Sequence, residues 1–308
     1  MTLSDATSGT IRLRAGDRVA SKWSGQSILV ERFLGEGANG SVYLARLPDG
    51  PSHCALKIGN DVYALQSEIN ALKSVGGDAP RLLLADDGTC RGVSFPFYVM
   101  SFVPGKPLGE TTFGADAGAL TTFGADLLGQ LRELHAAGWA FGDVKPDNVM
   151  IGRQGEVRLV DYGGATRFGS SVKQFTELYD RGYWKLGGRR AEAAYDLFAF
   201  AVVMLEAAGL GRRVRAIAGT SRRDKAKELV ALVDESPLLA AEANVLKRLL
   251  RGECGDTEQA LGAWAAAAAK PPPRHAPAAG ERWPAYWFAG AAAAFAGAVW
   301  WMSGNGLS

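Results

Sequence analysis

One short stretch of this sequence carries side chains that could transfer a phosphoryl group. Residues 141–148 read Phe-Gly-Asp-Val-Lys-Pro-Asp-Asn, and a further acidic residue, Asp161, follows a short apolar run. Phosphoryl transfer needs a group that orients the hydroxyl nucleophile, a cation near the moving phosphoryl group and oxygen ligands for Mg²⁺. Asp143, Lys145, Asn148 and Asp161 could supply these groups. A single Asp-x-x-x-x-Asn is common in turns, so the hypothesis depends on the segments upstream.

A glycine-rich segment precedes this stretch. Residues 34–43 read Leu-Gly-Glu-Gly-Ala-Asn-Gly-Ser-Val-Tyr and contain the pattern G-x-G-x-x-G. The pattern alone is weak, since it also marks hairpins and dinucleotide sites. A dinucleotide site would have a helix directly after the glycines, whereas residues 41–45 are β-prone and lead to a turn at residues 47–50. We therefore expect strand, glycine turn and strand, with backbone N–H groups that can lie close over phosphates.

Two further elements could place a cation near the glycine turn. Residues 54–58, Cys-Ala-Leu-Lys-Ile, predict a strand that carries Lys57. Residues 62–74 have helical periodicity and carry Glu68, which could pair with the lysine. The expected apolar face of this helix consists of Val62, Leu65, Ile69 and Leu72.

Taken in this order, the segments resemble the eukaryotic-type (Hanks-type) protein kinases of the bacterial kind. The resemblance implies an α+β, two-lobed fold, with a small β-rich lobe at about residues 28–103 and a large helical lobe at about residues 104–266. It also implies ATP and Mg²⁺ or Mn²⁺ as cofactors and a protein substrate with a Ser or Thr acceptor. Lys145, two residues after Asp143, resembles the Ser/Thr branch of the family rather than the Tyr branch.

The resemblance implies a role for each residue of the catalytic loop, which we define as residues 141–148. Asp143 would orient the substrate hydroxyl and accept its proton, and Lys145 would stabilise the transferring phosphoryl group. Asn148 and Asp161 would bind the metal ion.

The resemblance also implies how the nucleotide is held. Lys57, placed by an ion pair with Glu68, would hold the α- and β-phosphates. Met100 would be the gatekeeper, followed by the hinge that hydrogen-bonds the adenine through its main chain. The implied nucleotide-binding residues besides Lys57 and Glu68 are Leu34, Gly35, Gly37, Gly40, Val42, Ala55, Met100, Ser101, Val103 and Met150.

Several positions depart from the family pattern. The loop normally opens His-Arg-Asp, but here Gly142 replaces the arginine that receives a phosphate from the activation segment (residues 164–183). The chain thus resembles the "non-RD" kinases, whose activity does not depend strictly on that phosphate. The metal-binding triplet has Tyr162 in its centre instead of Phe, and the triplet Ala-Pro-Glu is missing. Asp196, inside an apolar run, is expected to hold the catalytic-loop backbone from below, which would offset its burial.

Composition limits the class of protein. The chain has 308 residues, 47% of them hydrophobic, and a net charge of +2. This length accommodates both lobes and additional segments, and the near-neutral charge gives no sign of nucleic-acid binding. The three cysteines are widely spaced, which fits a reducing cytosol. Residues 1–27 lack a signal-peptide core and are expected to be flexible, with residues 11–14 as the only hint of a strand.

The end of the sequence predicts a membrane anchor. A Pro- and Ala-rich linker at residues 267–283 leads to an uncharged stretch at residues 284–302 with aromatic residues at both ends, followed by a short tail at 303–308. Such a stretch is long enough to cross a bilayer as a helix. The basic residues before it predict an inner-membrane protein with its kinase domain in the cytoplasm, and its small residues would permit a homodimer. A helix packed on the lobe, or lying in the membrane interface, is the alternative.

Two other functions remain open from the sequence. Gly142 before Asp143 is reminiscent of the antibiotic and sugar kinases, which would make the chain a small-molecule phosphotransferase. The altered triplets would also suit a pseudokinase scaffold. Retained nucleotide turnover would exclude the scaffold, and the nature of the acceptor would separate the two kinds of kinase.

Overall fold

The computed structural model describes residues 11–37, 39–59, 61–77, 79–173, 176–220 and 224–269. The chain divides into two compact units, Met1–Lys270 and Pro271–Ser308, and the described residues all belong to the first. The predicted membrane helix at 284–302, the tail and most of the linker therefore lie outside the described residues, as do residues 1–10.

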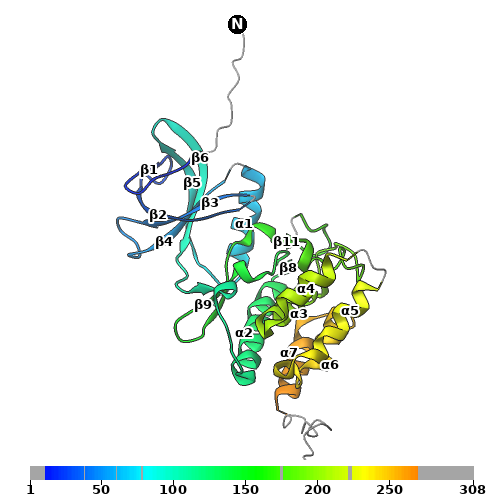
Figure 1. Ribbon diagram of the computed structural model, residues 1–308. Helices are drawn as coiled ribbons and strands as arrows, with labels where there is room; N and C mark the ends of the chain where they lie inside the picture. The colour runs from blue at the N-terminus through cyan, green and yellow to red at the C-terminus, as the bar shows by residue number, and fades with distance from the viewer. Residues whose placement is uncertain are drawn as a thin grey trace, which may run out of the picture. The chain divides into compact units, whose positions relative to one another are not determined.

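The small lobe is a closed barrel of six antiparallel strands in the order β1-β2-β3-β4-β6-β5 (Figure 1, dark blue to cyan). The glycine turn joins β2 to β3, as predicted, where Gly37 pairs with Gly40. Side chains that alternate along the strands fill the barrel, among them Ile28, Tyr43 and Leu56. The strands are β1 (Arg18–Ser21), β2 (Ser27–Gly37), β3 (Gly40–Arg46), β4 (Cys54–Ile58), β5 (Leu82–Cys90) and β6 (Val93–Ser101).

Helix α1 (Val62–Ser74) has the bounds that the sequence predicts. Asp61 directly precedes the helix, and its carboxylate accepts hydrogen bonds from the N–H groups of Tyr63 and Ala64 and so caps the first turn. The face predicted to be apolar is buried at Leu65, Ile69 and Leu72. The prediction is wrong for Val62, which is 60% exposed because the first residue of the helix lies outside the packed face.

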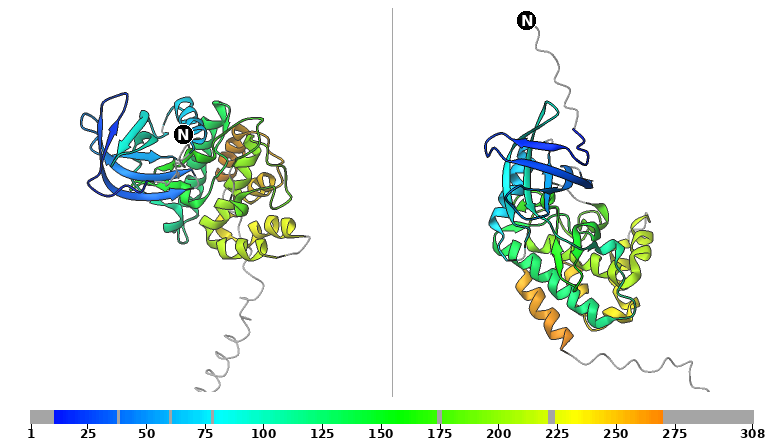
Figure 2. Two further views of the ribbon diagram at one scale, coloured as in Figure 1. Left: turned by 90° about the horizontal axis from the view of Figure 1, so that it is seen from above. Right: turned by 90° about the vertical axis from the view of Figure 1, so that its left-hand side faces the viewer.

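The large lobe is built around helix α3 (Ala193–Leu205), in which every residue is buried. Helix α2 (Ala117–Ala136) packs against α3 and runs beside α7 (Thr257–Ala268), as the right-hand view of Figure 2 shows for the latter pair. The continuous stretch Ala193–Ala218 is long and apolar enough to cross a membrane, but two thirds of it are buried in the lobe, as expected for a core helix. The remaining α-helices are α4 (Gly211–Ala218), α5 (Lys225–Leu232) and α6 (Ala243–Leu250).

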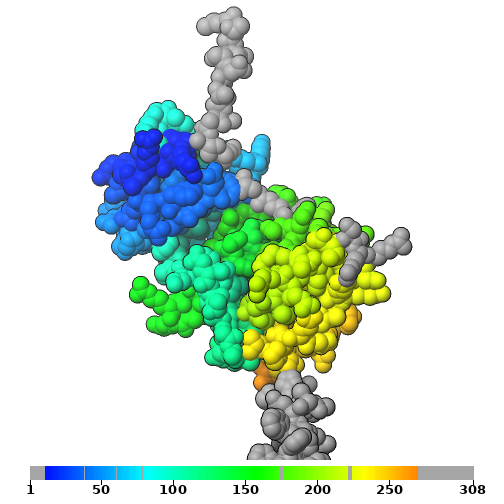
Figure 3. Space-filling model, viewed as in Figure 1, coloured from blue at the N-terminus to red at the C-terminus, as the bar shows by residue number. Residues whose placement is uncertain are grey.

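Short elements between the lobes carry the loops of the site. The space-filling view places the blue small lobe directly against the green part of the large lobe, which contains the short strands and the short helices η1 to η4 (Figure 3). The short strands are β7 (Lys106–Pro107), β8 (Trp139–Ala140), β9 (Val149–Ile151), β10 (Val157–Leu159) and β11 (Thr166–Arg167). The short helices are η1 (Leu108–Glu110), η2 (Pro146–Asn148), η3 (Tyr162–Gly164), η4 (Glu177–Tyr179), η5 (Glu206–Leu210), η6 (Val233–Glu235) and η7 (Pro237–Leu239).

The prediction that residues 1–27 are flexible is wrong for residues 11–27. Strand β1 pairs with β2 on one side and with β5 on the other, and so closes the barrel. Residues 11–14 form no strand, but Leu13 is buried and its N–H donates to the Tyr43 hydroxyl at 3.2 Å. These residues are ordered because they complete the small-lobe core, which short local patterns do not reveal.

Candidate active site

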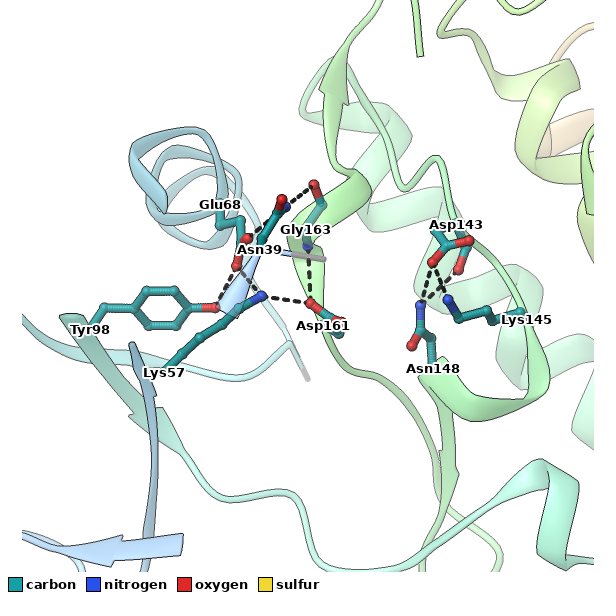
Figure 4. Close-up of polar contacts among 9 residues, drawn as sticks. All are labelled: Asn39, Lys57, Glu68, Tyr98, Asp143, Lys145, Asn148, Asp161 and Gly163. Carbon is teal, nitrogen blue, oxygen red and sulfur yellow. Dashed lines mark hydrogen bonds and ion pairs between the residues drawn. The ribbon is translucent and has the colours of Figure 1, made fainter. Parts of the chain in front are cut away.

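The small-lobe half of the site is the buried ion pair between Lys57 and Glu68. Lys57 lies near the end of β4, paired with Val42 of β3 and Tyr98 of β6, which fixes its side chain on the face next to α1. Its Nζ is 2.7 Å from Glu68 Oε2 and 2.7 Å from Asp161 Oδ1 (Figure 4). One cation therefore connects the small lobe, α1 and the metal-binding triplet.

The charges of this cluster support one another. Burial opposes the charge of Lys57, but the carboxylates of Asp161 and Glu68 outweigh it and raise the pKa of the ammonium. Burial also opposes ionisation of Asp161, but the nearby Lys57 ammonium lowers the pKa of this carboxyl. Burial raises the pKa of Glu68, which makes the hydrogen bonds that the carboxylate receives important for its ionised form. Lys57 is thus a permanent cation at the site.

Asp161 is held in an unusual conformation. It follows β10 with a left-handed backbone (φ 61°), and its carboxylate accepts the N–H of Gly163 at 3.3 Å. A non-glycine residue in this region is often found at functional sites, where the surrounding structure holds it. Tyr162, which replaces the usual Phe, is buried, and its ring contacts Phe141 edge-on at 5.3 Å between centroids. Burial raises the pKa of the Tyr162 phenol, so it packs as a neutral aromatic ring.

The large-lobe half of the site is the catalytic loop. Lys145 Nζ lies 2.5 Å from Asp143 Oδ2, and Asn148 Nδ2 donates to the main-chain oxygen of Asp143 at 2.9 Å (Figure 4). Thr176 Oγ1 donates to Asp143 Oδ1 at 3.0 Å and lies 3.5 Å from Lys145 Nζ. The carboxylate of Asp143 is thus fixed on both oxygens, and the three residues predicted in this loop are brought together.

Asp196 supports the catalytic loop from below, as the sequence predicts. Its fully buried carboxylate accepts the N–H groups of Phe141 at 2.6 Å and Gly142 at 2.8 Å. His135, at the end of α2, also contacts it, with Nε2 2.8 Å from Asp196 Oδ2. Gly142 has φ +79°, and a Cβ at this position would lie 2.4 Å from the main-chain oxygen of Gly164. This local conformation therefore requires glycine, and an arginine would force the backbone to move.

A cavity of about 530 Å³ lies between the glycine turn, the hinge and the metal-binding residues. Its volume is typical of a small-molecule site. Within the described part of the chain, the N–H and C=O of Val103 have no backbone partner, so they can hydrogen-bond a ligand. Of the predicted nucleotide- and metal-binding residues, all except Glu68 line it: Leu34, Gly35, Gly37, Gly40, Val42, Ala55, Lys57, Met100, Ser101, Val103, Asn148, Met150 and Asp161.

The lining of this cavity fits a nucleotide with a divalent cation. Apolar side chains such as Val42, Ala55 and Met150 can contact a base, and the ammonium of Lys57 stands where anionic phosphates would need a cation. The oxygens of Asn148 and Asp161 are hard ligands, which suit Mg²⁺ or Mn²⁺. The residues that line the cavity are therefore chemically suited to bind ATP and a divalent metal ion.

The segment that lacks the closing Ala-Pro-Glu triplet is held by its own ion pairs. Asp180 is fully buried and accepts hydrogen bonds from the Tyr195 hydroxyl and from Arg189 Nε, which is 2.7 Å away. Arg181 and Glu192 form a second ion pair at 2.5 Å. The geometry of this segment is therefore maintained by ion pairs and hydrogen bonds within residues 180–195.

A second cavity of about 390 Å³ lies on the large lobe beside the catalytic loop. It shares Asp147 with the first cavity, so the two adjoin at the catalytic loop. It contains both acidic and basic side chains, and Glu206 is paired with Arg215 at 2.6 Å and bonded to the Tyr179 hydroxyl at 2.6 Å. Pro146 and Asp147 of the catalytic loop contribute to the lining of this polar groove.

Three residues of the site were not predicted in their roles. Thr176 lies in the activation segment, and nothing local in the sequence places its hydroxyl on Asp143. Tyr98 and Asn39 both bond to Glu68. For Tyr98 a signal did exist, because strand alternation puts it on the same face as Met100, two residues later.

Comparison with known proteins agrees with this geometry. Residues 28–224 match the protein kinase domain. The chain is 35% identical over 255 residues to the serine/threonine-protein kinase YabT of Bacillus subtilis, which covers 80% of this chain and 73% of that protein. It is 32% identical over 154 residues to the probable serine/threonine-protein kinase PkwA of Thermomonospora curvata, which covers 47% of this chain and 20% of that protein.

Proposed function

The chain belongs to the protein kinase family and is a protein serine/threonine kinase, and from this we propose that it phosphorylates Ser and Thr hydroxyls of protein substrates in signalling at the inner face of a membrane. The observation that carries the assignment of its site is the position of Lys57, 2.7 Å from both Glu68 and Asp161. This contact joins the two lobes around the cavity that suits a nucleotide. The similarity to serine/threonine protein kinases favours protein acceptors over the small alcohols of antibiotic and sugar kinases.

Each residue then has a defined task in the transfer. Bound ATP supplies the γ-phosphoryl group, and a bound divalent ion, which we propose is Mg²⁺, neutralises charge on it. Asp143 orients the acceptor hydroxyl and takes its proton, while Lys145 donates to the oxygens of the transferring group. Lys57 would hold the α- and β-phosphates, and Asn148 and Asp161 would hold the metal ion.

Thr176 completes this arrangement. Because its hydroxyl donates to one oxygen of Asp143 while Lys145 binds the other, the carboxylate is oriented before an acceptor arrives. Groups fixed in advance need no reorganisation during the reaction, which lowers its barrier. Thr176 therefore links the activation segment to the position of the catalytic carboxylate.

Activity should not require a phosphate on the activation segment. Gly142 supplies no cation for such a phosphate, and its φ of +79° shows why the loop keeps glycine. The loop backbone is instead fixed by Asp196. We therefore propose that the chain behaves as a "non-RD" kinase.

We further propose that residues 284–302 anchor the kinase in the inner membrane as a single-pass helix with the kinase domain in the cytoplasm. The support is the uncharged stretch with aromatic residues at both ends and basic residues before it. Small residues in this stretch would allow two such helices to pack in a homodimer. Labelling of a cysteine placed at Ser308 by an impermeant reagent added outside the cell would support the span, and labelling only after lysis would exclude it.

The decisive test of function is phosphate transfer by the full-length protein in detergent, with radiolabelled ATP, Mg²⁺ and a generic basic protein as acceptor. Asp143→Asn tests the site, and Asp234→Asn, which removes an exposed ion pair with Lys247, is the matched control. We expect labelled Ser or Thr with the parent and the control but not with Asp143→Asn. Labelling of small alcohols instead of protein would contradict the proposal, as would ATP binding without any transfer.

A further inference from the structure

The carboxylate of Glu68 receives more hydrogen bonds than its pairing with Lys57 requires. The Tyr98 hydroxyl donates to Glu68 Oε2 at 2.9 Å, beside the Lys57 ammonium at 2.7 Å. Asn39 Nδ2 donates to the other oxygen, Oε1, at 3.2 Å (Figure 4). Glu68 is fully buried, and all three partners are donors, so the set is complementary to the ionised carboxylate.

Tyr98 is placed by the sheet. It pairs with Lys57 across β4 and β6, and cross-strand neighbours have their side chains on the same face. The side chain is fully buried, and burial keeps the pKa of the phenol well above its ordinary value, so the hydroxyl stays protonated and can donate. Phenylalanine would fill the same volume and remove only this donor.

Asn39 connects Glu68 with two further parts of the site. It belongs to the glycine turn, and its Nδ2 also donates to the main-chain oxygen of Gly163 at 3.1 Å. The turn lies close to the metal-binding triplet, since a Cβ on Gly37 would be 3.3 Å from Asp161 Oδ2. One amide therefore joins the turn, α1 and the triplet.

We propose that Tyr98 and Asn39 are positioning residues that hold Glu68, and through it Lys57, in the catalytic arrangement without a phosphate on the activation segment. Many kinase-like switches act by moving the helix that carries this glutamate. Here two neutral donors from the sheet and the glycine turn fix that helix, in a chain whose catalytic loop has Gly142 in place of a cation. The inference rests on the kinase activity and adds two residues to those that support it.

The expected effect follows from the strength of a hydrogen bond to a charged group. Loss of such a hydrogen bond lowers an equilibrium constant or a rate constant by roughly tenfold or more. We expect Tyr98→Phe and Asn39→Ala each to lower kcat by about tenfold, with a smaller change in KM for ATP. If Tyr98 and Asn39 both act through Glu68, neither substitution should lower kcat further in a Glu68→Gln background. If they act through packing instead, each substitution should lower kcat further in that background.

Tyr43→Phe is the matched control for Tyr98→Phe. Tyr43 is another fully buried tyrosine of the small lobe, but its side chain lies in the barrel core, where its hydroxyl accepts the Leu13 N–H. Both variants lose one hydrogen bond of a buried hydroxyl, and Tyr98→Phe should lose more stability because its partner is a carboxylate. Only Tyr98→Phe should change kcat.

The test makes two measurements on the full-length protein: hydrogen–deuterium exchange without nucleotide, and kcat in the transfer assay. Hydrogen–deuterium exchange of residues 62–74 in the nucleotide-free protein should be faster, by about threefold or more, in Tyr98→Phe and Asn39→Ala but not in Tyr43→Phe. Unchanged exchange and kcat in both site variants would overturn the proposal, as would an equal loss in Tyr43→Phe. The exchange measurement needs no turnover, so it separates a failure of this inference from an inactive kinase.

Discussion

Replacing Gly142 by alanine tests why the catalytic loop lacks the usual arginine. The residue has φ +79°, and an added Cβ would lie 2.4 Å from the Gly164 main-chain oxygen, closer than real Cβ contacts. The obstacle is backbone and not the flexible end of a side chain, so it can be relieved only by moving the loop or the segment after Asp161. We therefore expect Gly142→Ala to displace Asp143, the next residue.

The size of the effect has two parts. A left-handed backbone costs a non-glycine residue about 1–2 kcal/mol, of which about 0.4–1 kcal/mol is offset because alanine reduces the freedom of the unfolded chain. Forcing an extra methyl group against fixed atoms adds about 1–3 kcal/mol. The free energy of unfolding should therefore fall by about 1–5 kcal/mol. A shift of about 1 Å in Asp143 should lower kcat by about a hundredfold.

Gly155→Ala is the matched control because Gly155 has φ +91° but nothing within 4 Å of an added Cβ. It should lose only about 1 kcal/mol and keep full activity. Urea unfolding and phosphate transfer to a basic protein measure both quantities. If Gly142→Ala loses no more stability and activity than Gly155→Ala, the close approach to Gly164 does not control the loop and the reasoning is refuted.

Other outcomes follow from the same contacts. Thr176→Val should lower kcat about tenfold because it removes a hydrogen-bond donor from Asp143, whereas Thr176→Ser keeps the hydroxyl and should retain most activity. Steady-state kinetics measures both variants, and an equal loss of kcat in the two would show that the hydroxyl is irrelevant. Lys57→Met should abolish transfer and destabilise the protein by about 3–5 kcal/mol in urea, since it leaves the fully buried carboxylate of Glu68 without its cation; a smaller loss would mean that this carboxylate takes up a proton or water. EDTA should abolish transfer, and Asn148→Ala should raise the Mg²⁺ concentration needed for half-maximal rate. Burial raises the pKa of the Cys54 thiol from 9.0 to about 11, so its contribution to stability is complete below pH 9 and is lost as the pH rises towards 11; Cys54→Ala should lack this part of the pH dependence in urea titrations from pH 8 to 11.

Local sequence signals predicted much of the small lobe. Strand β4 and helix α1 have the expected bounds because each depends on a short pattern, a β-prone run in one case and an apolar helical period in the other. The pairing of Lys57 with Glu68 followed from the order of those two elements once the family resemblance was recognised.

The rest depends on contacts between distant segments. Strand β1 has four residues with two buried side chains, which is too short a pattern to predict, and it is ordered only because β2 and β5 pair with it. Thr176 and Asn39 are polar residues in loops, and their partners lie 33 and 29 residues away in sequence. Composition and periodicity carry no information about such contacts, and the family resemblance did not supply their roles.

Closure of the small lobe by β1 has a consequence for how other chains can bind it. An open sheet offers a row of unpaired backbone groups at its edge, where a foreign strand can add. Strand β1 is paired with β2 through residues 18–20 and with β5 through residues 20–21. A foreign strand therefore cannot add at this place, and a partner must recognise it through side chains.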